Sequence, residues 1–345
     1  MKIRTFFAVL LCKLARGLLR LLRRGGTAFP GRVALKVYPQ VLGVLSRGVR
    51  VILVTGTNGK TTSSRMIEQA FADAGLNYFA NRSGANLISG ITAEFAMHST
   101  LTGRPKCQFA VIECDEAASK TVLKYLKPEV IVATNVFRDQ LDRYGEVTHT
   151  LENIRIGIEN SPHAKLALNA DDSLCTSLAG AVPNPVLFYG VNTPIYASRV
   201  EELSDAPYCI RCKHAYVYDY VTYGHLGKYR CPACGYSRPE PEIAVSEVAV
   251  TDAEHSEVVF DDGKKRIPAT ICLPGGYNIY NACAAMAAGK LLGLKEETVA
   301  ASLASFSCGF GRMEKFGNVR MILVKNRSEE RRVGKECRSR WSPYH

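Results

Sequence analysis

The first candidate site is a short glycine loop that ends in a lysine and two threonines. It consists of Gly56, Thr57, Asn58, Gly59, Lys60, Thr61 and Thr62. Glycines allow backbone N–H groups to approach a phosphate, and the start of a helix favours negative charge. The lysine can reach the outer phosphates of a nucleotide, while the hydroxyl of Thr61 can bind Mg²⁺. The first glycine lies two positions closer to the lysine than in the usual P-loop pattern. An ordinary glycine turn is the alternative, but this combination of residues predicts a loop that binds ATP with Mg²⁺.

A second candidate is a group of acidic residues that directly follows an apolar run. Glu113, Asp115 and Glu116 come after residues 109–112. Acidic residues in such a place often belong to a solvated loop. Beside a phosphate-binding loop, however, a carboxylate is a suitable ligand for Mg²⁺. We therefore predict that Glu113 binds the magnesium ion together with Thr61.

Four cysteines form a third candidate site, and their spacing is typical of a structural metal centre. Two Cys-x-x-Cys pairs are separated by eighteen residues, as in zinc ribbons. They are Cys209, Cys212, Cys231 and Cys234. Four unrelated thiols are the alternative. Because four protein ligands leave no open position on the metal, we predict structural Zn²⁺ without chemistry of its own.

These residues need elements that hold them in place, and the hydrophobic pattern supplies candidates. Residues 50–54, 109–112 and 130–134 are short β-branched runs typical of buried parallel strands, and residues 61–74 form a helical pattern. Strands that alternate with helices predict an α/β fold with a mainly parallel sheet. Ligands of such sheets bind beyond the carboxyl ends of the strands, which is where the glycine loop and Glu113 lie.

Composition and charge exclude several classes of protein. The chain has 345 residues, of which 47% are apolar and 22% charged, so it is neither a disordered chain nor a small disulfide scaffold. The net charge is +12, but residues 1–50 contain no acidic residue, and residues 51–326 are close to neutral. A uniformly basic nucleic-acid binder is therefore not expected. The start of the chain imitates a signal peptide but lacks a cleavage site, and no apolar run reaches membrane-spanning length. We predict a cytoplasmic protein, with the inner face of the membrane as a second possibility.

Residues 5–24 are predicted to form a basic amphipathic helix. On a helical wheel, the basic residues fall on one arc, and Phe7, Leu11, Leu14, Leu18, Leu21 and Leu22 lie opposite. We expect this apolar face to pack on the protein itself. The alternative is a contact with an anionic membrane surface.

Five motifs, in order along residues 51–314, resemble those of the Mur ligase family. They are Val54-Thr-Gly-Thr-Asn-Gly-Lys-Thr-Thr62, Thr134-Asn-Val-Phe-Arg-Asp-Gln-Leu-Asp-Arg-Tyr-Gly145, Leu168-Asn-Ala-Asp-Asp172, Gly276-Tyr-Asn278-Ile-Tyr-Asn281 and Gly311-Arg-Met-Glu314. The resemblance implies a Mur-ligase-type central ATP-binding domain. It also implies that Asn278 approaches the adenine and that Arg312 lies near the nucleotide.

The four-cysteine insert and the motif around Asp139 are similar to an amidating branch of the family. This resemblance implies that ATP activates the α-carboxylate of D-glutamate in the stem peptide of lipid II as an acyl phosphate. Ammonia from a glutaminase subunit of the GatD type would convert it to D-isoglutamine, a step of peptidoglycan biosynthesis. Two departures from the amino-acid-adding members favour this branch. Gln140 replaces a histidine that many of them carry, and no lysine lies between Gln140 and Lys165, where they keep a carbamylated lysine.

The family also implies a further domain after the last motif. Residues 319–326 are predicted as its first strand, whereas residues 327–345 are polar and aperiodic. We expect a truncated domain followed by a non-native tail, with a genuine short tail as the alternative. The catalytic aspartate of the family's final domain would then be missing, and this chain would be inactive alone. The predicted divisions are a basic helical segment (1–50), an ATP-binding domain (51–314) with a zinc-ribbon insert (205–241), a truncated domain (315–326) and the tail (327–345).

Two other functions remain open. One is an amino-acid-adding ligase of the same fold, either a muramyl-peptide or a folylpolyglutamate ligase. The other is a nucleic-acid-binding protein that combines a zinc ribbon and a basic head with a P-loop switch. The near-neutral charge of residues 51–326 argues against the second, and we expect no nucleic-acid partner.

Overall fold

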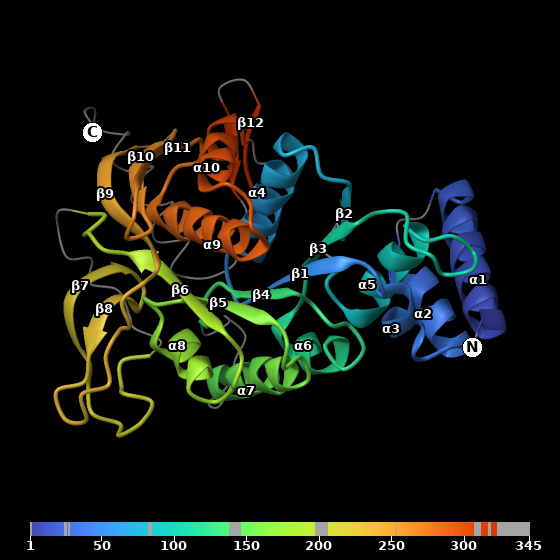
Figure 1. Cartoon of the computed structure of the whole chain (residues 1–345), viewed down its shortest axis with the longest axis horizontal. Helices are drawn as coiled ribbons and strands as arrows, with labels where there is room; N and C mark the ends of the chain where they lie inside the picture. Colours follow the sequence, from blue (N-terminus) through green and yellow to red (C-terminus); the bar gives the residue numbers. More distant parts are fainter. Residues whose placement is uncertain are drawn as a thin grey trace, which may run out of the picture.

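The centre of the protein is a large β-sheet. A computed structural model describes residues 2–23, 26, 28–81, 85–137, 146–196, 206–252, 254–306, 312–316 and 319–322. Within these residues the sheet has nine strands (Figure 1). In spatial order they are β11 (Arg266–Ile271), β10 (Ser256–Asp261), β9 (Ile243–Thr251), β6 (Val186–Val191), β5 (Lys165–Asn169), β4 (Val130–Ala133), β1 (Arg50–Thr55), β3 (Phe109–Glu113) and β2 (Tyr78–Ala80).

The sheet is mainly parallel, as the sequence predicts. All neighbouring strands from β2 to β9 run in the same direction, and only β10 is antiparallel to its neighbours β9 and β11. In β1, Ile52 and Val54 belong to the core on one face of the sheet, whereas Val51 and Leu53 belong to the core on the other. Successive side chains of a strand point to opposite faces, so a strand covered on both sides must be apolar throughout.

Helices cover both faces of the sheet. The helices α4 (Lys60–Asp73), α9 (Gly276–Leu292) and α10 (Glu296–Ser305) pack on one face, above the sheet in Figure 1. The helices α5 (Ile88–Met97), α6 (Glu116–Val122), α7 (Glu146–Glu159) and α8 (Ser173–Ala179) pack on the other. The helix predicted for residues 61–74 is thus α4, which begins directly after the glycine loop. This arrangement is a three-layer α/β fold.

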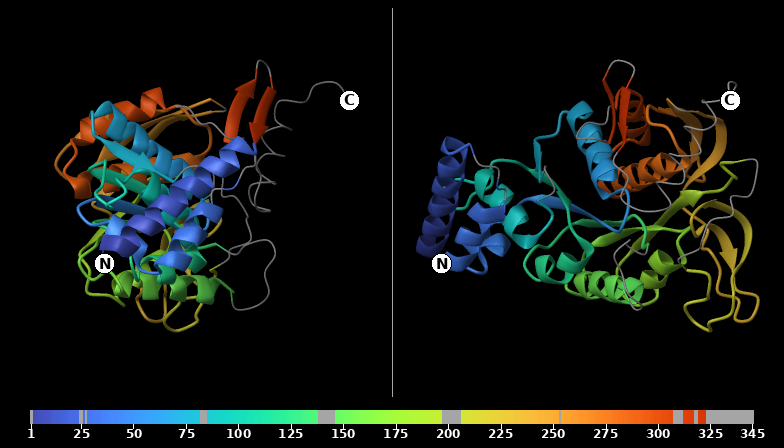
Figure 2. Two further views of the ribbon diagram at one scale, coloured as in Figure 1. Left: turned by 90° about the vertical axis from the view of Figure 1, so that its right-hand side faces the viewer. Right: turned by 180° about the vertical axis from the view of Figure 1, so that it is seen from behind.

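The N-terminal helix lies at one end of the molecule, and its packing corrects a prediction. The helix α1 (Lys2–Leu21) packs next to α2 (Ala28–Val37), and α3 (Val41–Leu45) follows (Figure 2). We expected the apolar face of α1 to pack on the protein, but this expectation is wrong. The buried side chains of α1 are Thr5, Ala8, Val9 and Cys12, while the residues of the predicted apolar face are exposed: Phe7, Leu11, Leu14, Leu18, Leu21 and the following Leu22.

Polar contacts and small side chains determine which face of α1 points inward. The Nζ of Lys13 donates to the carbonyl oxygen of Ser99 at 2.6 Å, and Arg16 pairs with Glu94 on α5 at 3.0 Å. The small buried residues allow α1 to approach its neighbours closely, which large leucines would prevent. No helix among the described segments combines the length and apolar character needed to cross a membrane.

Two small sheets lie apart from the large one. The strands β7 (Val217–Tyr223) and β8 (Leu226–Arg230) form an antiparallel ribbon within the four-cysteine insert. The strands β12 (Arg312–Phe316) and β13 (Val319–Ile322) form a second antiparallel pair. The strand predicted for residues 319–326 corresponds to β13, whereas the tail at 327–345 lies outside the described residues.

Candidate functional site

The glycine loop lies at the carboxyl end of β1, where the order of the sheet changes direction. β1 is flanked by β3 on one side and by β4 on the other. Along the chain, β2 and β3 are placed on one side of β1, and β4, β5 and β6 then follow on its other side. Such a switch point leaves a crevice beyond the strand ends, in which α/β proteins bind their ligands. Residues 56–59 connect β1 to α4 at this point.

Residues after β4 hold the backbone of the glycine loop. The N–H of Thr57 donates to the carbonyl oxygen of Asn135 at 2.8 Å, and the N–H of Asn58 donates to Asn135 Oδ1 at 2.9 Å. The Thr134 hydroxyl donates to the carbonyl oxygen of Asn58 at 2.7 Å. Gly56 has a φ of +123°, and a Cβ there would lie 2.3 Å from Thr134 Oγ1. Only glycine therefore fits this close approach of two backbone segments.

The first turn of α4 presents backbone donors at the same switch point, beyond the end of β1. Gly59 is the N-cap residue, has a φ of +82°, and provides no side-chain cap. The first N–H groups of a helix have no partner inside the helix, and they carry the positive end of its dipole. Lys60 and Thr62 are buried, and Thr61 is half-buried. This helix start can therefore accept a phosphate group.

The amine of Lys60 points back across the loop. Its Nζ donates to the carbonyl oxygens of Gly56 at 2.5 Å and Thr57 at 3.1 Å. It also forms an ion pair with Glu116 at 3.1 Å, and both side chains are mostly buried. The amine thus lies inside the curve of the loop, where it can meet an anion. Glu116 belongs to the acidic motif, but the sequence alone does not reveal that it pairs with Lys60.

Thr61 and Glu113 form a pair of oxygen donors suited to Mg²⁺. The Thr61 hydroxyl donates to Glu113 Oε2 at 2.8 Å. Neighbouring ligands of an octahedral Mg²⁺ lie about 3 Å apart, since each is about 2.1 Å from the ion. Asn81 fixes the backbone of Glu113 through two hydrogen bonds, of 2.8 Å and 2.7 Å. Asp115 has a different role, because its carboxylate caps the start of α6.

Asn278 and Asn281 on α9 lie beside the glycine loop and the first turn of α4. Ser63 on α4 donates to Asn281 Oδ1 at 3.2 Å, and Asn281 Nδ2 donates to Asn278 Oδ1 at 3.0 Å. Asn278 is buried and donates to the carbonyl oxygen of Pro274 at 2.7 Å. Its expected approach to adenine stays a prediction. Arg312 is the first residue of β12, and its expected place near a nucleotide also stays a prediction.

A buried polar network behind the loop was not anticipated from the sequence. Asp171 accepts from Arg238 Nε at 2.6 Å and from the Tyr280 hydroxyl at 2.6 Å, and both charged side chains are almost fully buried. Burial raises the pKa of Asp171, although the charge of Arg238 opposes this shift. Two such charges can remain buried because each is compensated by the opposite charge of its partner. Its partners lie 67 and 109 residues away in sequence, so no local pattern reveals them.

Asp172 connects the four-cysteine insert to the segment after β4. Its Oδ2 accepts from the N–H of Val136 at 2.7 Å, and His225 Nε2 lies 3.3 Å from its Oδ1. Burial opposes the ionisation of Asp172, but His225 and the backbone donors outweigh it and hold its pKa below the usual value. The ring of His225 also packs against Phe137, whose N–H donates to the Thr57 hydroxyl at 3.0 Å. The turn between β7 and β8 therefore contacts the support of the glycine loop.

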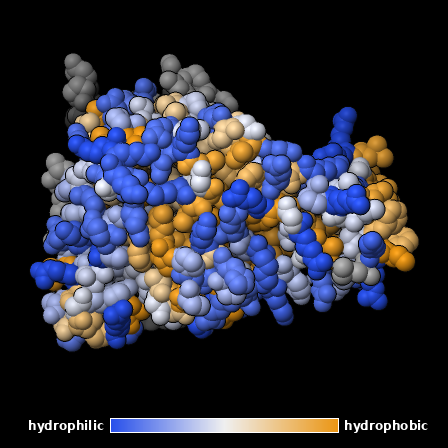
Figure 3. Space-filling model, in the orientation of Figure 1, coloured by the Kyte–Doolittle hydropathy of each residue, from blue (hydrophilic) through white to orange (hydrophobic). Residues whose placement is uncertain are grey.

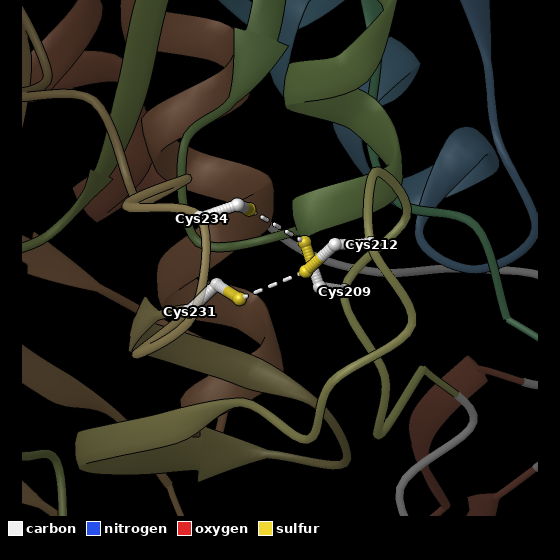
Figure 4. Close-up of side chains that lie close together, drawn as sticks. All are labelled: Cys209, Cys212, Cys231 and Cys234. Carbon is white, nitrogen blue, oxygen red and sulfur yellow. Dashed lines mark hydrogen bonds between the residues drawn. The ribbon is translucent and has the colours of Figure 1, made fainter.

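The four predicted cysteine ligands lie together. Their sulfur atoms all lie within 4.8 Å of one another (Figure 4). Among the residues that the structure describes, this is the group of His, Cys, Asp or Glu side chains that lie close enough together to hold a metal ion. Cys209 and Cys234 are 3.6 Å apart, and Cys212 and Cys231 are 3.4 Å apart. A tetrahedral Zn²⁺ with Zn–S bonds of about 2.3 Å separates its sulfurs by about 3.8 Å. The cluster therefore has the size of a zinc site.

Backbone donors in each Cys-x-x-Cys turn favour thiolates. Burial opposes ionisation of Cys209, but the N–H groups of Cys212 and Arg211 outweigh it and lower its pKa to about 6. The N–H groups of Cys234 and Ala233 likewise lower the pKa of Cys231 against the effect of burial. The N–H of His214 favours the thiolate of Cys212, but burial and the hydrogen bonds with the other three sulfurs outweigh it and raise the pKa of Cys212. Metal ligands must be thiolates, so the backbone donors prepare two of the four sulfurs, and a bound cation would offset the repulsion among all four. The residues present fit Zn²⁺.

Parts of two motifs lie outside the described residues. These are residues 138–145 of the motif that begins at Thr134, with Asp139 and Gln140 among them, and Gly311 of the last motif. The departures from the family pattern at Gln140 therefore stay a sequence observation.

Comparisons with known proteins agree with this geometry. The Mur ligase middle domain matches residues 54–213. The MurT subunit of lipid II isoglutaminyl synthase from Staphylococcus aureus (strain N315) is 35% identical over 324 residues, which are 94% of this chain and 71% of that protein. The UDP-N-acetylmuramoylalanine–D-glutamate ligase of Pelotomaculum thermopropionicum is 26% identical over 280 residues, 81% of this chain and 49% of that protein.

A solved structure has a similar fold. The pseudomurein peptide ligase type C of Methanothermus fervidus superimposes with a TM-score of 0.68 and 25% identity. The match covers 84% of this chain and 56% of that one. Together with the long match to a MurT subunit, these similarities extend well beyond the glycine loop. The chain therefore belongs to the Mur ligase family, in the group that contains the MurT subunits of lipid II isoglutaminyl synthase.

Proposed function

We propose that this chain is the ligase subunit of an enzyme that amidates the D-glutamate α-carboxylate of lipid II in peptidoglycan biosynthesis. ATP would bind at the glycine loop with its phosphates toward Lys60 and the start of α4. Thr61 and Glu113 would hold Mg²⁺, which would neutralise phosphate charge. Zn²⁺ would be structural at the four cysteines. A glutaminase subunit of the GatD type would supply the ammonia.

The proposed reaction has two steps. A carboxylate oxygen of the substrate attacks the γ-phosphorus of ATP, and the bond to the bridging oxygen breaks, so that an acyl phosphate and ADP form. The nitrogen of ammonia then attacks the acyl carbon, the C–O bond to phosphate breaks, and a proton is lost. The products are the amide, ADP and inorganic phosphate. Lys60 and the backbone donors of α4 can stabilise the charge on the transferred group, which is the main requirement of phosphoryl transfer.

One observation carries this proposal: the similarity to a MurT subunit extends over 94% of the chain at 35% identity. The similarity to an amino-acid-adding ligase is lower, at 26% over 81%. That ligase function remains the second candidate, because the glycine loop and the Thr61–Glu113 pair would serve both reactions equally. A nucleic-acid-binding role has no comparable support, since the charge of residues 51–326 is close to neutral.

A product assay distinguishes these functions. The chain is supplied with ATP, Mg²⁺, lipid II, glutamine and a GatD-type glutaminase, and the products are analysed by mass spectrometry. Because the sequence predicts a truncated final domain, we expect no product from the chain as given. When the final domain of a MurT subunit replaces residues 327–345, we expect conversion of the acid to a primary amide that depends on ATP and on glutamine or ammonium. Addition of a whole amino acid would instead identify an amino-acid-adding ligase. Steeply salt-dependent binding of DNA or RNA, with no change in lipid II, would support the nucleic-acid alternative.

A further inference from the structure

The exposed side of α1 carries a continuous apolar stripe. It consists of Ile3, Phe7, Leu11, Leu14, Leu18, Leu21 and Leu22, whose exposed fractions range from 38% to 81%. From Ile3 to Leu21 these residues follow one another at intervals of three or four, and Leu22 lies four positions after Leu18, so they lie along one side of the helix. The side that packs on the protein lies roughly opposite. Figure 3 shows apolar atoms gathered at the end of the molecule that α1 forms.

Such a stripe is unusual for a surface that faces water alone. Single exposed apolar residues are common, but a contiguous row of large ones marks an interaction site. Within the described residues, α1 already has its packing partners in α2, α3 and α5, and none of them covers the stripe. The stripe is therefore available to a partner.

The charges around the stripe indicate what that partner is. Residues 1–50 contain basic residues and no acidic residue. Lys2, Arg4, Arg20 and Arg23 are exposed. At 100° per residue, Arg4 lies at one edge of the stripe, whereas Lys2 and Arg20 lie about 100° past its other edge. Two copies of this face would bring like charges together, whereas an anionic surface would complement them.

We propose that α1 docks the protein on an anionic lipid bilayer, with the stripe inserted at the level of the headgroups. A helix with an apolar face and flanking basic residues lies in the plane of the interface, with the apolar side about 5–10 Å deep. The basic residues then remain at the height of the lipid phosphates. The polar contacts of Lys13 and Arg16 with the protein hold the stripe outward before the lipid is met.

Vesicle sedimentation with the purified full chain, without nucleotide, tests this proposal. We expect binding to vesicles of phosphatidylglycerol and phosphatidylcholine, and much weaker binding to phosphatidylcholine alone. Leu14→Gln/Leu18→Gln should weaken binding about tenfold or more, since it removes two inserted side chains. Arg4→Gln/Arg20→Gln should weaken it about fivefold per charge. Because all four positions are exposed, the melting temperature should stay unchanged.

The matched control replaces two exposed valines elsewhere. Val217→Gln/Val250→Gln, on β7 and β9, should bind vesicles as the wild type does. No binding by the wild type, equal binding to neutral vesicles, or full binding by the leucine variant would each overturn the proposal. A lipid-free dimer that the leucine variant abolishes would also overturn it and would identify a second copy as the partner. Since no ATP is present, these outcomes do not depend on the proposed catalytic function.

Discussion

Lys60 and Gly59 show how single residues prepare the glycine loop for an anion. The Lys60 amine contacts two loop carbonyl oxygens and Glu116, so it is already positioned over the loop. Gly59 turns the chain into α4 with a left-handed conformation, and Asn281 lies directly against it. Both residues depend on groups that come from other strands and helices.

Lys60→Ala should weaken ATP binding about ten- to a hundredfold. The substitution removes a charge-assisted contact with phosphate, which contributes about 1.5–3 kcal/mol. Isothermal titration calorimetry with ATP and Mg²⁺ measures the change. Lys120→Ala, at an exposed position of α6, is the control and should bind ATP normally. Equal affinities of the two variants would show that ATP does not bind at this loop.

Gly59→Ala should destabilise the protein more than Gly293→Ala does. Both glycines have a φ near +80°, so both variants should lose about 1 kcal/mol to backbone strain. Only at Gly59 would the new Cβ meet an atom, Asn281 Oδ1, at 2.1 Å, whereas nothing lies within 4 Å at Gly293. Urea denaturation compares the free energies of unfolding, and ATP binding should fall only in Gly59→Ala. Similar losses in both variants would contradict the importance of the Asn281 contact.

At the scale of elements, the four-cysteine insert is a small unit with little apolar core. Its buried cluster consists of Cys209, Tyr216, Tyr229 and Cys231. Thr176 on α8 shares hydrogen bonds with the hydroxyls of Tyr229 and Tyr236, at 2.5 Å and 2.7 Å. So small a core cannot stabilise a fold alone, and metal ligation usually supplies the remainder.

Cys231→Ser/Cys234→Ser should abolish the binding of one equivalent of zinc. The loss of ligation should unfold mainly the insert, because the large sheet has its own cores on both faces. Elemental analysis measures the zinc, and hydrogen exchange locates the loss of protection between residues 206 and 241. Cys107→Ser/Cys272→Ser, outside the cluster, should keep the metal. Unchanged zinc in the first variant would refute the site.

The turn between β10 and β11 provides a pH-dependent link to α9. Asp262 in this turn pairs with Lys290 at 2.8 Å and accepts two backbone N–H groups. The Lys290 ammonium and these donors hold the pKa of Asp262 well below its usual range. A carboxylate of this kind stabilises the fold above its unfolded pKa of about 4 and loses that contribution as the pH falls through its lower folded value.

Asp262→Asn should therefore destabilise the protein at pH 7 and have much less effect near pH 2. Urea denaturation of wild type and variant across this range measures the difference in the free energy of unfolding. Asp219→Asn is the control, because its contact with Lys228 is long and exposed. A difference between wild type and Asp262→Asn that stays constant with pH would contradict the assigned ion pair.

At the scale of the whole molecule, one buried ion pair joins the insert to the sheet. Arg238 follows the insert's last cysteine, and Asp171 follows β5. The Arg238 guanidinium also donates to the carbonyl oxygen of Val191 at 3.2 Å and to Asn192 Oδ1 at 2.8 Å. Because Asp171 also accepts from Tyr280 on α9, three distant parts of the chain meet at one carboxylate.

Arg238→Met should lower the free energy of unfolding by about 3–5 kcal/mol. The substitution leaves Asp171 charged and buried without its cation, which costs more than the pair itself contributes. Arg266→Met is the control, since its pair with Glu247 is exposed and should contribute less than about 1 kcal/mol. Chemical denaturation measures both. Equal small effects would show that Asp171 finds another partner or a proton.

The sequence by itself determined the elements and the ligand sets that rest on local order. Apolar runs and their spacing predict the strands β1, β3 and β4, the helix α4 and the parallel sheet. The strands can be predicted because burial on both faces of the sheet requires apolar side chains at each position. The choice of the four cysteines as ligands also follows, since two Cys-x-x-Cys pairs separated by eighteen residues are typical of zinc ribbons. These features depend on residues that are near one another in the chain.

The tertiary structure alone decided which distant groups meet and which face of a helix is covered. The pairs Lys60–Glu116 and Arg238–Asp171 join residues 56 and 67 positions apart. No short sequence pattern predicts either pair, because each forms only when the folded sheet brings distant segments of the chain together. The orientation of α1 was wrongly expected from its pattern. Amphipathicity shows that one face avoids water, but packing on α2 and α5 left that face outward, since small residues and two cations fit the protein better than leucines do.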